Sequence, residues 1–398
     1  MDLVETLNGM RNVLCLKRQL DFHAPITYSQ IRYYSNPDNA TSRYIHFEIP
    51  KKTGGVRKIT APDAKNYKVI LLCLNELLKT LYIPSKYAMG FVEGRSVVSN
   101  AETHKNQNYV FNIDLKDFFT SITMERVVKR LCLKPFNFSN EIASVIAGLC
   151  CMKDDNNNYV LPQGAATSPL LTNAVCDDLD RCLAGVAKRF HLNYSRYADD
   201  ITFSSMHNVY QKDGDFIKEL TRIISAQGFT INEKKTRLQK RGSRQEVTGV
   251  IVSQKLNVTQ NYVRNIRNIL YILEKYSIRD AYSRFLKKYK QEKGYIKKGV
   301  PNIINVLDGK LLYLKMIKGD DDSVYQKLRH KFEMLMKRDN IDKYPCSKVD
   351  NCEIVYYDPI SGKTILTVEL GDYPETFLSR GRMKRWGKRR AKHPLLTE

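Results

Sequence analysis

The chain has 398 residues, of which 65 are Lys or Arg and 42 are Asp or Glu, so its formal charge at pH 7 is +23. A hydrophobic content of 42% allows a real core and excludes a disordered basic tail protein, and the length suits two or three domains. This excess of positive charge predicts a polyanionic partner, either nucleic acid or an anionic membrane surface.

Neither a membrane span nor export is expected. The sequence has no uninterrupted run of about 18 apolar residues, and its N-terminus lacks a basic stretch followed by an apolar one. Nine scattered cysteines are typical of reduced thiols and lack the paired spacing of a structural zinc site. We therefore expect a cytoplasmic protein with no membrane partner.

The first part of the chain alternates between predicted helices and strands. Apolar residues at helical spacing predict a helix within the first 30 or so residues. Segments 44–50 and 56–60 flank the pair Gly54-Gly55 and predict a β-hairpin. The hairpin tip carries four basic side chains and no acid: Lys51, Lys52, Arg57 and Lys58. A helix over about residues 66–82 follows.

Three segments in the middle of the chain stand out. Residues 109–115 predict a buried strand that ends near Asp114, and residues 161–169 predict a tight turn that leads into a helix. Residues 194–204 predict two short strands with Asp199-Asp200 at the turn between them. Aromatic and β-branched neighbours distinguish this Asp-Asp pair from those in polar segments elsewhere.

The character of the chain changes from about residue 261. Residues 261–298 hold eleven Lys or Arg, three acids and seven Tyr or Phe at helical spacing. A second pair of helices is expected after them. Residues 341–375 predict a small β element, and residues 376–398 form a basic tail.

Asp114 and the pair Asp199-Asp200 indicate phosphoryl transfer on nucleic acid. Two Mg²⁺ ions roughly 3.5–4 Å apart stabilise the attacking and leaving oxygens of an in-line displacement. Mg²⁺ prefers oxygen ligands and takes one or two carboxylates beside phosphates and water. If the strand that ends at Asp114 lies beside the hairpin at 197–201, the chain brings the required aspartates together.

Three segments, 111–119, 163–169 and 197–200, resemble the successive polymerase motifs of reverse transcriptases in order and spacing, and the resemblance extends over about residues 40–335. Residues 100–104 (Asn-Ala-Glu-Thr-His) and 247–249 (Val-Thr-Gly) are similar to two short elements of bacterial retron reverse transcriptases. The resemblance implies an α+β right-hand polymerase fold with fingers, an antiparallel palm and a helical thumb. The implied divisions are 1–110 for the N-terminal helix and fingers, 111–255 for the palm with fingers insertions, 256–340 for the helical thumb and 341–398 for a small basic C-terminal extension.

The resemblance also implies roles for single residues. Asp114, Asp199 and Asp200 would bind two Mg²⁺ ions and catalyse the transfer. Phe119 would exclude a 2′-hydroxyl, and Lys235, or the lysine before it, would protonate the leaving pyrophosphate. The residues implied to hold the incoming nucleotide are Arg57, Lys51, Lys52, Phe119, Gln163, Gly164 and Lys235.

RNA contacts are expected from three regions. Asn100 and His104 share a helix face and suit a structural or RNA-contact role, with plain packing as the alternative. Aromatic and basic side chains at the thumb position and in the tail would stack on bases and hold phosphates. These residues are Arg264, Arg267, Lys287, Lys288, Arg382, Arg385, Trp386 and Arg389.

The expected function is RNA-directed DNA synthesis on a structured non-coding RNA, with dNTPs as substrates and an RNA–DNA hybrid as product. A retron-type enzyme would prime from a 2′-hydroxyl of that RNA, leave a branched product (msDNA) and act in antiphage defence beside a separate effector protein. The alternatives are another bacterial defence reverse transcriptase without the branch, and a non-catalytic RNA-binding scaffold.

Overall fold

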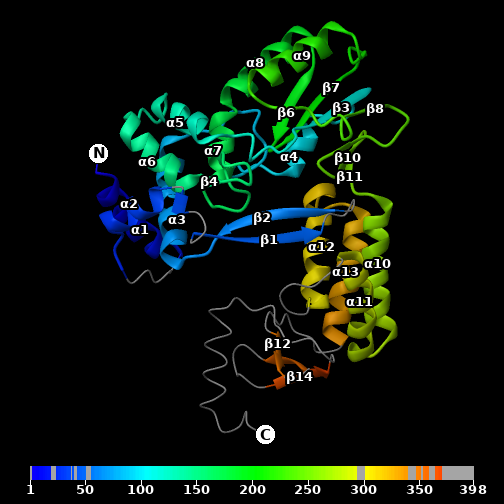
Figure 1. Ribbon diagram of the computed structural model, residues 1–398. Coiled ribbons are helices and arrows are strands. Elements are labelled where there is room, and N and C mark those ends of the chain that lie inside the picture. Colours follow the sequence, from blue (N-terminus) through cyan, green and yellow to red (C-terminus); the bar gives the residue numbers. More distant parts are fainter. Residues whose placement is uncertain are drawn as a thin grey trace. The chain divides into compact units, whose positions relative to one another are not determined.

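The computed structural model divides after Leu256 into two compact units, Met1–Leu256 and Asn257–Glu398. Helices and antiparallel sheets occur together, which confirms the predicted α+β class (Figure 1). The structure describes residues 2–18, 24–36, 38–39, 43–50, 55–293 and 301–338, and the backbone of strands 347–350, 353–357 and 364–369.

Helices pack in pairs at the start of the first unit. α1 (Leu3–Arg18) contacts α3 (Lys65–Leu81), and α2 (Tyr28–Ser35) contacts α6 (Asn140–Cys150). The apolar stripe of α3 is buried because residues three and four apart share one helix face. Its fully buried side chains include Tyr67, Ile70, Leu71, Leu74 and Leu78.

The predicted hairpin is confirmed as β1 (Tyr44–Pro50) and β2 (Val56–Pro62). The strands pair antiparallel from Tyr44 opposite Pro62 to Pro50 opposite Val56. Lys51 and Lys52, at the tip, lie outside the described residues.

A four-stranded sheet forms the centre of the first unit. Its order is β6 (Asn193–Tyr197), β7 (Asp200–Ser205), β3 (Tyr109–Asp114) and β8 (Arg237–Lys240), and all neighbours run antiparallel. α8 (Asp177–Arg189) packs on β6 and on α9 (Asp215–Ala226) (Figure 1). Phe216 of α9 contacts Phe203 of β7, with 5.1 Å between ring centroids, so aromatic packing fixes the helices to the sheet.

Short elements complete the first unit around this sheet. They are α4 (Val97–Glu102), α5 (Met124–Cys132), β4 (Met152–Lys153), β5 (Tyr159–Val160), α7 (Ser168–Val175), β9 (Glu246–Val247) and β10 (Val250–Val252), with β11 (Leu256–Asn257) at the division between the units.

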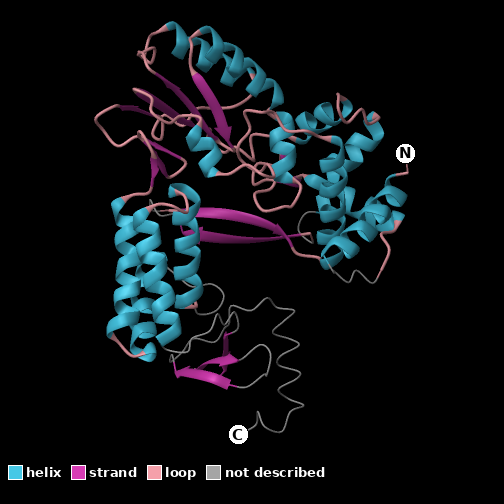
Figure 2. Ribbon diagram, turned by 180° about the vertical axis from the view of Figure 1, so that it is seen from behind, coloured by secondary structure: helices cyan, strands magenta, loops and turns pink. Residues whose placement is uncertain are grey.

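The second unit contains a helical bundle, seen side by side in Figure 2. Its helices are α10 (Gln260–Lys275), α11 (Ile278–Lys293), α12 (Ile303–Lys318) and α13 (Ser323–Arg338). Three strands follow in the order β12 (Ser347–Asp350), β13 (Glu353–Tyr357) and β14 (Thr364–Glu369). Among the residues that the structure describes, no helix has both the length and the apolar character needed to cross a bilayer.

Candidate active site

Strand register brings the three predicted aspartates to one end of the central sheet. Asp114 is the last residue of β3 and pairs with Asp200, the first residue of β7. Asp199 lies in the two-residue loop between β6 and β7, and its carbonyl accepts a hydrogen bond from the Leu115 N–H at 3.0 Å. Residues far apart in the sequence therefore meet as neighbours.

The carboxylates at this edge disfavour one another's charge. Loss of solvation, followed by repulsion from Asp199 and then Asp114, raises the pKa of Asp200 to about 6. Loss of solvation also raises the pKa of Asp199, with repulsion from Asp114 adding to it. Clustered carboxylates with raised pKa values are typical of functional sites. A bound cation would relieve the repulsion between them.

Lys235 neutralises part of this cluster. Its Nζ donates to both carboxylate oxygens of Asp114, at 2.8 and 2.9 Å, and Asn232 Nδ2 donates to Oδ1 at 3.0 Å. The hydrogen bond between Lys235 and Asp114 is the largest cause that raises the pKa of Lys235. The predicted lysine therefore lies at the aspartate cluster, held by the carboxylate that it neutralises.

The aspartates offer suitable donor atoms for a divalent cation, but their side chains alone do not form a complete coordination site. In the described part of the chain, no three His, Cys, Asp or Glu side chains converge closely enough to hold a metal ion by themselves. Oxygen is nevertheless the only donor type that Asp114, Asp199 and Asp200 offer, and this matches the preference of Mg²⁺.

Phe119 differs from its aromatic neighbour in a way that bears on the predicted nucleotide pocket. Phe118 is 4% exposed and belongs to the core, whereas Phe119 is only partly buried. The Phe119 ring packs at 5.6 Å from Phe118 and 6.3 Å from Phe91. Phe119, to which the family resemblance assigns the exclusion of a 2′-hydroxyl, is therefore the more accessible ring of the two.

The turn at Gln163 and Gly164 is joined to the hairpin strand β2. The Thr60 N–H donates to the Gln163 carbonyl at 3.0 Å. Gly164 has φ +138°, and a Cβ there would lie 2.7 Å from the Thr60 carbonyl oxygen. Only glycine allows this conformation and this close backbone approach.

Arg57 extends from β2 as an exposed side chain. Its positive charge is among the influences that lower the pKa of Asp199 against the larger effect of desolvation. Arg57 is therefore within electrostatic reach of Asp199.

The predicted RNA contact of Asn100 and His104 is wrong, because both side chains are fully buried. His104 Nε2 lies 2.7 Å from Ser195 Oγ on β6, and Nδ1 lies 2.8 Å from Ser204 Oγ on β7. Burial lowers the pKa of His104 to about 3, so the ring is neutral. The structural role, which was expected beside RNA contact, is supported instead.

The hydrogen bonds around His104 run in one direction. Ser195 donates its only hydroxyl hydrogen to Asn100 Oδ1, so it accepts from His104 Nε2. Nδ1 therefore accepts from Ser204, and Asn100 Nδ2 donates to Thr248 Oγ1 at 3.3 Å. This chain ties α4 and the 247–249 turn to both strands of the Asp199 hairpin.

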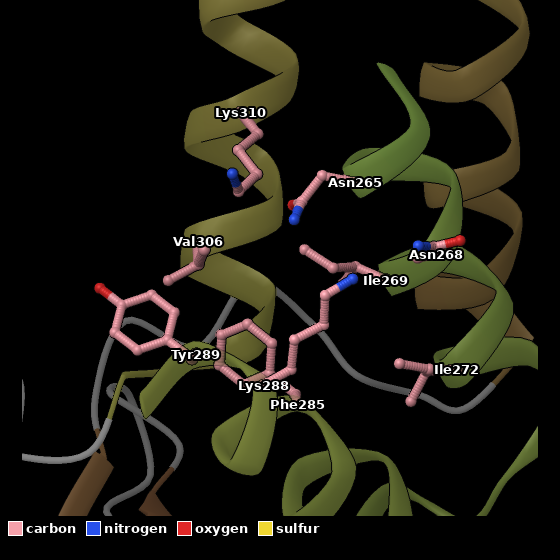
Figure 3. A pocket seen from close by; sticks show the side chains of 9 residues that line it. All are labelled: Asn265, Asn268, Ile269, Ile272, Phe285, Lys288, Tyr289, Val306 and Lys310. Atoms are coloured by element: carbon pink, nitrogen blue, oxygen red, sulfur yellow. The ribbon is translucent and has the colours of Figure 1, made fainter. Parts of the chain in front are cut away.

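The candidate RNA-contact residues of the second unit are exposed on α10 and α11. Arg264 donates to Asn261 at 3.3 Å, and Arg267 and Lys287 are exposed. Lys288 lines a cavity of about 130 Å³, where it reaches toward the same space as Asn265 and Lys310 (Figure 3). The full lining is Asn265, Asn268, Ile269, Ile272, Phe285, Lys288, Tyr289, Val306 and Lys310. The tail residues Arg382, Arg385, Trp386 and Arg389 lie outside the described residues.

Sequence reasoning missed a buried ion pair next to the aspartate turn. Arg196 on β6 and Asp180 on α8 are both fully buried and join at 2.7 Å. The one available signal was strand alternation, which puts Arg196 on the same face as the buried Tyr194. Nothing in the sequence identified its partner on α8.

The chain matches the family model of reverse transcriptases (RNA-dependent DNA polymerases) over residues 49–259. It is 35% identical to the retron Mx65 reverse transcriptase of Myxococcus xanthus over 268 residues, which is 62% of this chain and 60% of that protein. It is 38% identical to the retron Ec86 reverse transcriptase of Escherichia coli over 186 residues, covering 46% of this chain and 55% of the relative.

A third relative is matched over more of its length. The retron Ec73 reverse transcriptase of Escherichia coli is 32% identical over 251 residues, covering 59% of this chain and 77% of that protein. The chain thus spans less than two thirds of the length of the Mx65 and Ec86 enzymes. Among solved structures, telomerase from Candida albicans aligns with 84% of this chain and 68% of its own, at 10% identity and a TM-score of 0.41.

Neutralising one aspartate should stabilise the metal-free protein in a pH-dependent way. The folded pKa of Asp200, about 6, exceeds its unfolded value of about 3.9, so the penalty is full above pH 6 and relieved as the pH falls toward 4. Asp200→Asn should raise the melting temperature by a few degrees at pH 8 and by less at pH 5. Asp213→Asn, in an exposed loop, is the control; a gain that grows on acidification would contradict the prediction.

Replacing His104 should make stability less sensitive to acid. Because its folded pKa of about 3 lies below the unfolded value of about 6.5, neutral His104 stabilises the fold above pH 6.5, and this contribution fades between pH 6.5 and 3. His104→Gln should cost about 1–3 kcal/mol of unfolding free energy at pH 7 and less at pH 5, measured by urea denaturation.

His207→Gln, at an exposed imidazole, controls for the loss of a histidine. If His104→Gln instead weakened RNA binding at unchanged stability, burial would not describe its role.

Proposed function

Since the chain belongs to the reverse transcriptase family, and within it to the retron reverse transcriptases, we propose that it is an RNA-directed DNA polymerase that copies a structured non-coding RNA. The observation that carries the proposal is the meeting of Asp114, Asp199 and Asp200 at one end of an antiparallel sheet. A shared edge of acids in a chain of charge +23 suits phosphoryl transfer on a polyanion.

Each aspartate would contribute carboxylate oxygens to bound Mg²⁺. The ions, when bound, supply the positive charge that stabilises the attacking hydroxyl and the leaving pyrophosphate at the α-phosphorus. The raised pKa values of Asp199 and Asp200 support this role, because a cation would relieve the repulsion that raises them.

The remaining site residues would handle the nucleotide. Arg57, with Lys51 and Lys52 at the hairpin tip, would hold the triphosphate through charged hydrogen bonds. Gln163 and Gly164 would line the pocket, and Phe119 would lie under the sugar. Lys235 keeps its ammonium form beside Asp114, so it holds a proton that it could give to the pyrophosphate.

The architecture that this function requires is the right hand. The four-stranded sheet with α8 and α9 would be the palm, the β1–β2 hairpin part of the fingers, and α10–α13 the thumb. The proposed divisions are 1–110, 111–255, 256–340 and 341–398. Exposed Arg264, Arg267, Lys287 and Lys288 on α10 and α11 support RNA contact by the thumb, and the basic tail would add Arg382, Arg385, Trp386 and Arg389.

The retron relatives support a more specific proposal. The enzyme would prime from a 2′-hydroxyl of its own RNA, leave a branched RNA–DNA product and serve antiphage defence with a separate effector protein. A defence reverse transcriptase without the branch and a non-catalytic RNA-binding scaffold are the competing outcomes. Separate digestion of the co-purifying nucleic acid with RNase and with DNase separates them: DNA attached to an RNA remnant supports the branch, DNA without a remnant supports the unbranched enzyme, and RNA alone supports the scaffold.

The polymerase activity is tested by primer extension with an RNA template, dNTPs and Mg²⁺. Asp199→Asn combined with Asp200→Asn should reduce the rate at least about a thousandfold, because several kcal/mol of transition-state stabilisation depend on the metal site. The control is Asp320→Asn with Asp321→Asn, which changes an exposed acidic pair between α12 and α13. Product from the Asp199/Asp200 variant at the wild-type rate would exclude the catalytic role.

Phe119 is tested by sugar selectivity. Phe119→Val should raise ribonucleotide incorporation relative to deoxyribonucleotide incorporation about tenfold, because the smaller side chain leaves room for a 2′-hydroxyl. Phe119→Tyr keeps the ring and should keep the selectivity. Equal selectivity of wild type and Phe119→Val would refute the role of this ring.

A further inference from the structure

A buried ion pair lies directly beside the turn that carries the aspartates. Arg196 Nε donates to Asp180 Oδ1 at 2.7 Å, and Nη2 donates to Oδ2 at 2.8 Å. This two-pronged contact orients the guanidinium plane. The Tyr194 hydroxyl donates to the same carboxylate at 2.7 Å, so Asp180 is held from two sides.

The third nitrogen of the guanidinium reaches the turn itself. Arg196 Nη1 donates to the carbonyl oxygen of Ala198 at 3.2 Å and to Asn173 Oδ1 at 3.1 Å. Ala198 immediately precedes Asp199. A buried cation, fixed by a carboxylate on α8, therefore holds the backbone next to a candidate metal ligand.

Ala198 needs such support because its conformation is unfavourable. It has φ +57°, in the left-handed region that residues with a Cβ disfavour. It is also the first of two loop residues in a tight hairpin, where a positive φ favours glycine. The backbone of Gly90 also lies close against the turn, since a Cβ there would lie 2.7 Å from the Ala198 nitrogen.

Asn173 links Arg196 to the Gly90 backbone. Its Oδ1 accepts from Arg196, and its Nδ2 donates to the Gly90 carbonyl at 2.9 Å. Net stability alone does not explain a buried ion pair, because apolar residues of similar volume often stabilise a core as well or better. The contacts to the turn supply the missing reason.

We propose that Arg196, oriented by Asp180, is a positioning residue that holds Ala198 in its left-handed conformation and thereby directs Asp199 and Asp200 toward Asp114. The effect on synthesis rests on the proposed function, whereas the effect on the turn does not. Neither Arg196 nor Asp180 touches the reacting atoms.

The test combines Arg196→Lys with Ala198→Gly in the full chain. Lysine keeps the charge beside Asp180 but lacks the planar fork that also reaches Ala198. Glycine removes the penalty of the positive φ, so the turn no longer needs the arginine. Tyr194→Phe is the matched control, because it removes one buried hydrogen bond from Asp180 without touching the turn.

Two readouts keep the outcomes distinct. In hydrogen exchange of the peptide around residues 194–203, Arg196→Lys should exchange about tenfold faster than wild type. In primer extension it should lower kcat about tenfold to a hundredfold, with KM for the dNTP within about twofold. Addition of Ala198→Gly should restore most of both losses, and Tyr194→Phe should cause neither.

The proposal is overturned if Arg196→Lys matches Tyr194→Phe in both readouts, or if Ala198→Gly restores nothing. The Arg196–Asp180 ion pair would also be assigned to stability alone if three variants all failed to fold: Arg196→Lys, Tyr194→Phe and the double variant Arg196→Lys/Ala198→Gly. If wild type extends no primer, the proposed function fails, and hydrogen exchange still decides the role of Arg196.

Discussion

The pairing of β3 with β7 is the constraint on which the site depends. Because the strands run antiparallel with Asp114 opposite Asp200, one register places the end of one strand beside the start of the other. A slip of one residue would turn every side chain of β7 to the opposite face. The buried Ile113 and Ile201, also paired in this register, make such a slip costly, so core packing and site geometry are specified together.

Repulsion among the aspartates is the cost of this arrangement, and Lys235 offsets part of it. Lys235 and Asn232 bind the carboxylate of Asp114 directly. Within the hairpin, neutral His104 joins Ser195 to Ser204 without adding charge. The site is thus charged at its open edge and held by neutral or paired groups in the interior, where an unpaired charge would be expensive.

Local patterns predicted the elements of the site well. The hairpin at residues 44–62 and the strand–turn–strand at 193–205 follow from alternation and from turn residues, which act over a few positions. The juxtaposition of Asp114 with Asp199 was expected through the family resemblance, because strand order leaves no local trace.

Such local patterns do not predict which residues distant in the sequence become contact partners in the fold. The prediction that Asn100 and His104 share a helix face is wrong, because α4 ends at Glu102 and His104 lies in the turn after it. The burial of His104 depends on Ser195, which lies 91 residues further along the chain. Asp180 and Arg196 are 16 residues apart on a helix and a strand, a spacing at which no periodicity pairs them. A buried guanidinium resembles an exposed one in sequence, so its role appeared only with the fold.

The contact between β2 and the 163–164 turn has a mechanical consequence. Thr60 and Gln163 are linked backbone to backbone, and Gly164 leaves no side chain between the two segments to absorb a displacement. A displacement of strand β2 should therefore also displace the 163–164 turn. If a nucleotide draws Arg57 inward, as the proposed function implies, the same movement should displace the 163–164 turn, so that phosphate binding and the shape of the proposed nucleotide pocket would change together.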